Sequence, residues 1–195
     1  MAKTNVIERI ARVDEVHAET MAENPTEIKV ETLPFYKKFK LLLATVDLPQ
    51  RPVLLRYADD GSHVITLDAS PEHIYEVNKL EDLHLQAPHV ASYLRFFLEN
   101  SGGDAYHIVE TEKEVNWLKA SGQDPEVKAL KEKCIAMLHA IKITALPDGG
   151  HFANATAIRG RNLAEISVKV HVDGHVEILA EKTVLSNIPV AEVAW

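Results

Sequence analysis

The sequence has little cysteine and no long run of apolar residues. Its one cysteine, Cys134, has no partner for an internal disulfide, which argues against a disulfide-stabilised secreted protein and indicates a reducing, cytoplasmic setting. Charged residues occur early in the chain, at Lys3, Glu8 and Arg9, so we expect no signal peptide. No stretch approaches the roughly 18 uninterrupted apolar residues that indicate a membrane-spanning helix. We therefore expect a cytoplasmic protein with no membrane partner.

Glycine and proline are also scarce, with eight and nine among 195 residues, which excludes collagen-like and low-complexity linker sequences. A hydrophobic fraction of 46% and a charged fraction of 26% are typical of a folded globular chain. The net charge of −8 opposes binding to nucleic acid, and the densest basic run, Lys37-Lys38-Phe39-Lys40, is short. We expect no nucleic-acid partner.

Motifs that mark catalytic or cofactor sites are missing. The sequence has no glycine-rich phosphate loop, no Gly-x-Ser-x-Gly elbow and no His-Glu-x-x-His. Several of the ten histidines follow an acidic residue by three positions, among them the pairs Asp14/His17, Glu81/His84, Asp104/His107 and Asp148/His151. Only the first pair lies in a predicted helix, where that spacing brings the two side chains to one side. We predict no metal site, no cofactor and no catalytic residue.

Helical periodicity appears in three places. Residues 4–23 carry apolar positions at spacings of three and four and are predicted as one helix that ends at Asn24-Pro25. A second helix is expected from Pro88 to Glu99, with Val90, Tyr93, Leu94, Phe97 and Leu98 on or beside its buried face. A third helix is expected after Asp124-Pro125, with Cys134 on its apolar side. Residues Ile28 to Ile74, between the first two helices, are predicted as short extended runs separated by turns.

The last third of the chain has the pattern of an antiparallel sheet. Alternation from Ile166 to Val172, with turn residues on both sides, predicts a four-stranded meander over residues 140–181. Because a one-residue slip would place Glu177 on the valine face, we favour pairing Val172 with Val176 over pairing it with His175. A face of three alanines, Ala153, Ala155 and Ala157, would join the same side and allow a helix to approach closely or leave a pocket.

These elements predict an α+β fold, in which helices pack on a curved antiparallel sheet with a C-terminal four-stranded meander. We expect an N-terminal amphipathic helix in residues 1–25 and a single α+β domain in residues 26–195. A helix before a four-stranded meander is also the order of cystatin-like and nuclear-transport-factor-2-like folds, which is a comparison of fold alone.

Three short motifs resemble an uncharacterised bacterial protein family. They are Leu33-Pro34-Phe35-Tyr36, Ile74-Tyr75-Glu76-Val77-Asn78 and Tyr93-Leu94-Arg95-Phe96-Phe97, and the likeness extends from about Leu33 to the C-terminus. The sequence departs from the family pattern at His73, where a proline is expected. The resemblance supports the fold and implies no catalytic residue.

One group of polar and aromatic residues has the composition of a ligand-binding pocket: Tyr75, Glu76, Asn78, Tyr93, Arg95 and His107. Such a pocket would lie between the Tyr93 helix and the sheet. The alternative interpretation is structural, because Tyr93 would pack in the core, Arg95 could pair with Glu99 in solvent, and Glu76 could simply point outward.

Two classes of function remain. The missing motifs and the apolar chain ends favour a non-enzymatic binding or assembly protein, and the alternative is a small-molecule-binding protein or enzyme. The N-terminal stripe of Val6, Ile10 and Val13 and the apolar tail from Ile188 to Trp195 predict a homo-oligomer or a protein partner bound through the chain termini. Equally, both ends could fold back on the chain's own core.

Overall fold

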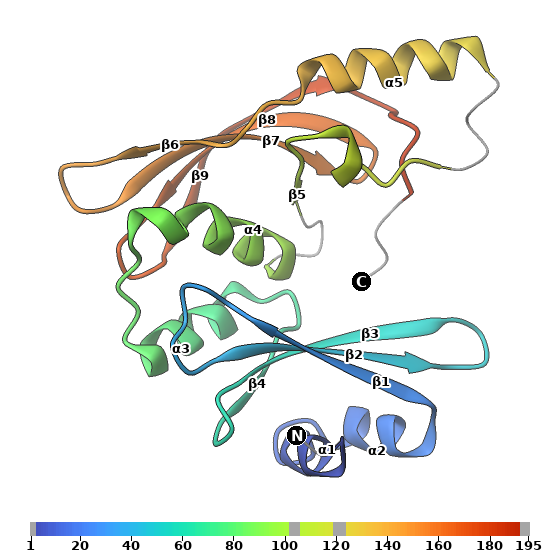
Figure 1. The fold of residues 1–195 in the computed structure, drawn as a ribbon, viewed down its shortest axis with the longest axis vertical. Coiled ribbons are helices and arrows are strands. Elements are labelled where there is room, and N and C mark those ends of the chain that lie inside the picture. Colours follow the sequence, from blue (N-terminus) through green and yellow to red (C-terminus); the bar gives the residue numbers. More distant parts are fainter. Residues whose placement is uncertain (1–2, 102–105, 119–123, 192–195) are drawn as a thin grey trace. The chain divides into compact units, whose positions relative to one another are not determined.

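The computed structural model describes residues 3–101, 106–118 and 124–191, and the chain forms two compact units. The N-terminal unit comprises Met1–Leu83 and the C-terminal unit His84–Ala194. Each unit packs helices against its own antiparallel sheet, so the α+β fold class is confirmed (Figure 1). The expected boundary near residue 25 differs from this division, because the N-terminal helices share a core with the first sheet.

The predicted helix over residues 4–23 is wrong in one respect, because the structure has two helices there. Helix α1 spans Lys3–Ile10 and α2 spans Glu15–Glu23. The break occurs where Asp14 caps α2 by accepting a hydrogen bond from the backbone N–H of His17. An aspartate is more favourable at an N-cap than inside a helix, where its carboxylate competes for backbone donors.

The first sheet is a four-stranded antiparallel meander in the order β1-β2-β3-β4. Its strands are β1 (Thr26–Thr32), β2 (Lys40–Asp47), β3 (Pro52–Asp59) and β4 (Val64–Thr66). Leu42, Ala44 and Val46 alternate along β2 and form a buried cluster with Val6 and Ile10 of α1. Helix α2 adds Ala18 and Met21 to this cluster. Helices α1 and α2 thus lie on one side of the sheet (Figure 1).

Helix α3 (Pro71–Glu81) replaces part of what we expected to be an extended region. Its signals are present in the sequence, since Pro71 suits a first helical position and Ile74, Val77, Asn78 and Glu81 repeat at spacings of three and four. The buried Glu81 carboxylate accepts hydrogen bonds from the backbone N–H groups of the turn before β2, at 2.7 Å from Lys37 and 3.1 Å from Lys38. A short turn is therefore fixed to α3.

The C-terminal unit contains a five-stranded antiparallel sheet. The strands β6 (Lys142–Ala145), β7 (His151–Arg159), β8 (Asn162–Val170) and β9 (Val176–Leu185) form the predicted meander, and β5 (His107–Ile108) also pairs with β7. The remaining elements are two 3-10 turns, η1 (Ala87–His89) and η2 (Glu112–Glu114), and two helices, α4 (Val90–Asn100) and α5 (Pro125–Met137). Both helices were predicted from the sequence.

The register of the β8–β9 hairpin differs from the favoured one by two residues. Val170 pairs with Val176 and Val168 with Ile178, while Val172 lies in the loop and is 42% exposed. A shift of two residues keeps valine opposite valine, so the predicted face is correct although the predicted pairs are wrong. The alanine face is confirmed, because Ala153 pairs with Val168, Ala155 with Ile166, and both alanines are buried.

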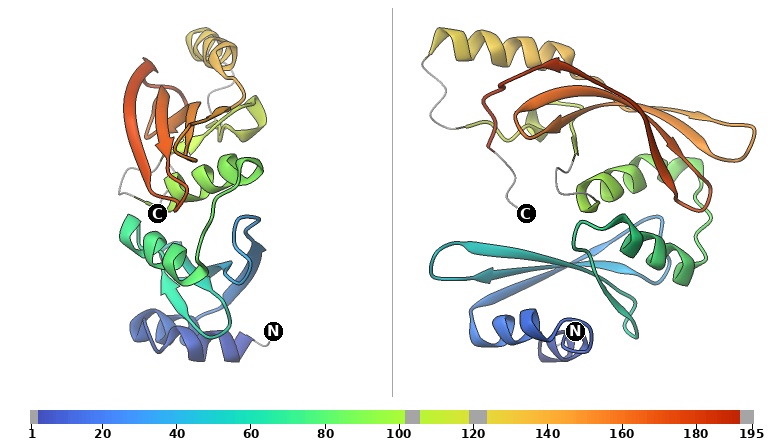
Figure 2. Two further views of the ribbon diagram at one scale, coloured as in Figure 1. Left: turned by 90° about the vertical axis from the view of Figure 1, so that its left-hand side faces the viewer. Right: turned by 180° about the vertical axis from the view of Figure 1, so that it is seen from behind.

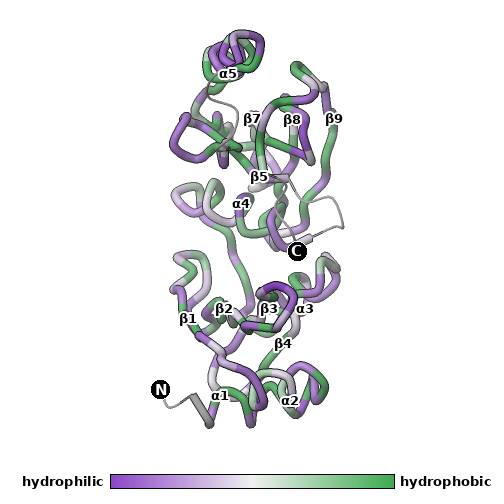
Figure 3. Tube along the Cα trace, turned by 90° about the vertical axis from the view of Figure 1, so that its right-hand side faces the viewer, coloured by the Kyte–Doolittle hydropathy of each residue, from purple (hydrophilic) through white to green (hydrophobic). Residues whose placement is uncertain are grey.

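The two helices of the C-terminal unit lie on opposite faces of its sheet (Figure 2). Helix α5 carries hydrophobic and hydrophilic residues around its axis, as Figure 3 shows, and Cys134 joins a buried cluster that includes Leu163 and Ile188. Burial raises the pKa of the Cys134 thiol, which makes it a poor nucleophile. Within the described ranges, none of the helices has both the length and the apolar character needed to cross a membrane.

Candidate functional site

The six residues predicted to form one ligand pocket fall into different units. Tyr75, Glu76 and Asn78 lie on α3 in the N-terminal unit, and Tyr93, Arg95 and His107 lie in the C-terminal unit. Neither unit therefore contains the whole group, and each residue is described in its own surroundings.

Two of the six residues support the fold. The Asn78 side chain is buried and its Oδ1 accepts a hydrogen bond from the Tyr36 hydroxyl at 2.6 Å. The fully buried Tyr93 donates from its hydroxyl to the carbonyl oxygen of Gly174 at 2.6 Å, which ties α4 to the β8–β9 loop. The hydroxyl groups of Tyr36 and Tyr93 thus each bond to a polar group inside their own unit. For Tyr93 this agrees with the structural interpretation, in which it packs in the core.

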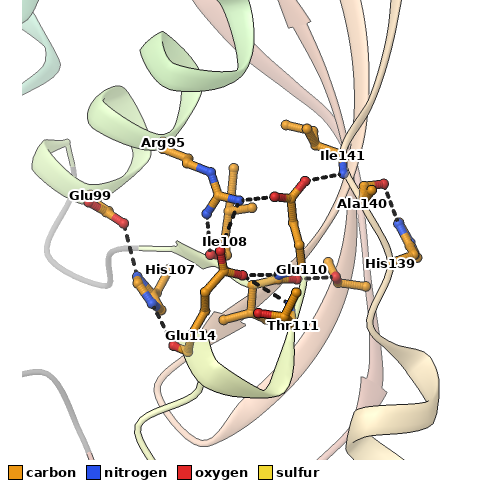
Figure 4. A network of polar contacts seen from close by, with 12 residues as sticks. Arg95, Glu99, His107, Ile108, Glu110, Thr111, Glu114, His139, Ala140 and Ile141 are labelled. Atoms are coloured by element: carbon orange, nitrogen blue, oxygen red, sulfur yellow. Dashed lines mark hydrogen bonds and ion pairs between the residues drawn. The ribbon is translucent and has the colours of Figure 1, made fainter. Parts of the chain in front are cut away.

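Arg95 occupies the centre of a polar network (Figure 4). Its guanidinium donates to the Ile108 carbonyl oxygen at 2.8 Å and to the Glu110 carboxylate at 2.6 Å. The other oxygen of Glu110 accepts from the backbone N–H of Ile141 at 2.6 Å. The network therefore joins α4, β5 and the segment that leads into β6. The pairing of Arg95 with Glu99 that we considered is not the one formed.

His107 lies between two acceptors in the same network. Its Nδ1 is 3.0 Å from the Glu99 carboxylate and its Nε2 is 3.1 Å from the carbonyl oxygen of Glu114. Only the protonated ring can donate to both. The hydrogen bond with Glu99 raises the pKa of His107, and partial burial opposes this effect without reversing it. His107 therefore links α4 to η2, and these contacts favour its protonated form.

Glu110 and Glu114 are the network members that sequence reasoning missed. Glu114 closes a capping box with Thr111 and accepts from the backbone N–H of Glu110 at 2.6 Å. The Thr-x-x-Glu spacing was a readable signal for this turn. No local sequence pattern predicts the ion pair between Glu110 and Arg95, because this contact depends on how α4 and β5 pack together. The carboxylates of this network are bonded to Arg95, to His107 and to backbone N–H groups. The network therefore holds segments of the fold in place.

Glu76 has a different setting from the other predicted residues. It is exposed on α3 and lines a cavity of about 190 Å³ in the N-terminal unit. The other lining residues come from α1 and the α1–α2 turn, from the β3–β4 hairpin, and from α3: Arg9, Arg12, Val13, Ser62, His63, Val64, Ile65 and Leu80. Tyr75, its neighbour on α3, is half-buried and bonded within the structure.

A larger groove of about 500 Å³ lies between α1 and α2. Its floor is apolar and includes Ile7, Ala11, Ala18 and Met21, and Ala22 completes it on α2. Three exposed carboxylates surround this floor: Glu8, Glu15 and Glu19. Among the described residues none of the three has an ion-pair partner. The break between α1 and α2 creates this groove, so the prediction of one continuous helix could not reveal it.

The chain ends behave differently from each other. Val6 and Ile10 are buried, whereas Val13 is 54% and Val16 is 72% exposed at the turn and on α2. At the other end Ile188 and Val190 are buried in the α5 cluster, which matches the alternative that the tail folds back. Trp195, the aromatic end of the predicted contact, lies outside the described residues.

Within the described ranges, no group of three or more histidine, cysteine, aspartate or glutamate side chains could hold a metal ion. Of the four acid–histidine pairs named from the sequence, Asp14 and His17 do meet, at 2.6 Å between Oδ2 and Nδ1. Asp60 and His63, which have the same spacing, also meet, at 3.1 Å between Oδ2 and Nδ1. Asp148 is instead bonded to Lys169 at 2.8 Å, and Asp104 lies outside the described residues. Partial burial works to raise the pKa of Asp14, but its hydrogen bonds with His17 and Tyr57 outweigh burial and lower it.

Comparisons with known proteins found no matching family model, no matching curated protein and no matching solved structure. The likeness to an uncharacterised bacterial family and the cystatin-like order of elements therefore stay predictions, and we infer function from the geometry of the chain.

Proposed function

We propose that the protein is a non-enzymatic binding protein whose α1–α2 groove accepts a basic, amphipathic helix from a partner protein. The observation that carries this proposal is the combination of an apolar floor with three unpaired carboxylates around it. The proposal retains the predicted association through a chain terminus and assigns it to the N-terminal helices.

Shape and apolar surface define the first half of the recognition. A groove of about 500 Å³ is large enough for several apolar side chains on one face of a helix. The small side chains of Ala11, Ala18 and Ala22 allow close approach, and Ile7 and Met21 provide apolar contact. Val16 lies on α2 outside the groove lining and is 72% exposed, so a partner helix that extended past the groove would gain free energy by covering it.

Charge is the second feature by which the groove would recognise a partner helix. Glu8, Glu15 and Glu19 place three negative charges around the groove without cations of the described chain to neutralise them. Lysine or arginine residues on the partner helix would supply complementary charge, which increases association rate and selectivity. A second copy of the chain is a poorer occupant, because a symmetric contact would bring the two acidic rims together.

The proposal also places the protein in the cytoplasm of a bacterial cell, in line with the family resemblance. Its support is the single cysteine, a buried free thiol of the kind that reducing compartments maintain. The absence of catalytic geometry in the Arg95 network supports a binding role for the chain, because the charged groups of that network are bonded to each other.

The proposal is tested with a synthetic lysine–leucine peptide of amphipathic helical pattern, titrated into the full chain and followed by fluorescence anisotropy. A glutamate–leucine peptide of the same pattern is the charge control. We expect saturable binding of the basic peptide only, weakening as salt increases.

Two matched double variants localise the effect. Reversing Glu15→Lys and Glu19→Lys should abolish peptide binding, whereas Glu27→Lys with Glu177→Lys changes the net charge equally at exposed sites elsewhere and should preserve it. Equal binding by both double variants would contradict the proposal. A chain that is dimeric alone, and becomes monomeric only in the first variant, would assign the groove to a second copy instead.

A further inference from the structure

The cavity beside Glu76 contains two opposite charges that do not neutralise each other. Arg12 enters it from the α1–α2 turn and Glu76 from α3, and both side chains are exposed. Within the described part of the chain, neither side chain has a hydrogen-bond or ion-pair partner. A guanidinium and a carboxylate therefore face one space of about 190 Å³ and remain available to a ligand.

The other charged groups of this cavity are already engaged. Arg9 forms an ion pair with the buried carboxylate of Asp59. His63 lies with its Nδ1 3.1 Å from the Asp60 carboxylate. Arg12 and Glu76 are thus the one cation and the one anion that the cavity offers among its described lining residues.

Apart from Ser62, the remaining lining residues are apolar. Val64 and Ile65 of β4 are buried at its base, while Val13 and Leu80 are 54% and 42% exposed beside it. An apolar group placed between Val13 and Leu80 would remove both from water. Drug-sized ligands occupy sites of roughly 300–1,000 Å³, so this cavity suits a smaller molecule.

We propose that this cavity binds a small zwitterion, namely a free α-amino acid with an aliphatic side chain. Its carboxylate would pair with Arg12, its ammonium group with Glu76, and its side chain would cover Val13 and Leu80. A dianion would be repelled by Glu76, and a diamine would be repelled by Arg12, so the pair of charges selects against both. The lining residues differ from those of the α1–α2 groove, and this proposal does not depend on the proposed function.

The test uses isothermal titration of the full chain with L-leucine. Two comparison ligands each lack one charge: 4-methylpentanoate has no ammonium group and 3-methylbutylamine has no carboxylate. We expect leucine to bind saturably, and each comparison ligand to bind at least about tenfold more weakly, because each loses one charge-assisted hydrogen-bonded pair.

Charge-neutralising variants assign the contacts. Arg12→Gln and Glu76→Gln should each weaken leucine binding by about tenfold, while Arg51→Gln and Glu27→Gln, which remove the same charges at exposed positions outside the cavity, should leave it unchanged. Circular dichroism confirms that all four variants fold. Absence of saturable leucine binding at about 1–10 mM, or equal binding of leucine and 4-methylpentanoate, would overturn the proposal.

Discussion

The two units use their charged side chains in different ways. In the C-terminal unit, Arg95 is bonded to Glu110 and His107 to Glu99, so that α4 is joined to the segment that follows it. In the N-terminal unit, charges near the core are also bonded, as Glu81 is to the turn before β2. In contrast, the carboxylates around its α1–α2 groove, and the side chains of Arg12 and Glu76, have no hydrogen-bond or ion-pair partner in the described chain. Bonded charges fix a fold, whereas unbonded charges beside apolar cavities can recognise another molecule.

The largest expected effect concerns the core that supports the C-terminal network. Leu94→Ala and Phe97→Ala should each lower the free energy of unfolding by about 2–5 kcal/mol, because both side chains are buried on α4. Urea denaturation followed by circular dichroism measures this change. Unfolding midpoints like those of the unchanged protein would show that α4 is not part of the core.

The next effect tests whether bonded charges stabilise the N-terminal unit as well. Glu81→Gln should cost about 1–3 kcal/mol, because the amide oxygen is a weaker acceptor for the backbone donors of Lys37, Lys38 and Phe39. Glu27→Gln, at an exposed position of the same unit, provides a control for loss of one negative charge. Equal urea midpoints for the two variants would mean that Glu81 does not hold this turn.

A smaller effect concerns pH. The folded pKa of His107 lies above its unfolded value of about 6.5. Its stabilising contribution is therefore complete below about pH 6.5 and is lost as pH rises through the folded pKa. The difference in unfolding free energy between the unchanged protein and His107→Gln should thus decrease from about pH 6 to pH 9.

The role of Glu99 in this pH effect can be separated in a double-variant cycle. In a Glu99→Gln background, His107→Gln should show a much weaker dependence on pH, because the carboxylate that raises the pKa of the ring is gone. A pH dependence of unchanged size in that background would show that Glu99 does not charge His107.

The smallest effect on stability is expected at the surface of α2. Val16→Ser should change the free energy of unfolding by less than about 0.5 kcal/mol, because the side chain is 72% exposed. The same substitution should weaken binding of the basic peptide, which separates recognition from folding. A large loss of stability with unchanged peptide affinity would place Val16 in the fold instead of the interface.

The sequence predicted those parts of the fold that have strong local patterns. Alternation from Ile166 to Val172, with turn residues on both sides, correctly predicted a strand of the meander, and β8 pairs with β7 through a two-residue turn after Arg159. Gly160 suits that turn because its φ is +57°. Helix α3 was missed because its first residues were included in a region predicted to be extended, although Ser70-Pro71 and the spacing to Glu81 indicate a helix.

The candidate sites were less accessible from sequence than the fold. The chemical types of Arg95 and His107 indicated polar contacts, but their partners Glu110 and Glu99 depend on tertiary packing. The α1–α2 groove depends on a helix break at Asp14. The apolar periodicity predicted one continuous helix there, so the capping role of Asp14 was not recognised. Glu76 lines a cavity other than the predicted pocket beside the Tyr93 helix, and Arg12, which lines the same cavity, comes from a segment more than 60 positions away.

The most direct test of the contrast between the two units is an amide NMR titration of the full, isotopically labelled chain with the basic lysine–leucine peptide. We expect shift changes concentrated in residues 7–22, with the amides of Arg95, His107 and Glu110 unchanged. Shift changes centred on the Arg95 network, or spread evenly over acidic residues of both units, would contradict the assignment of recognition to the α1–α2 groove.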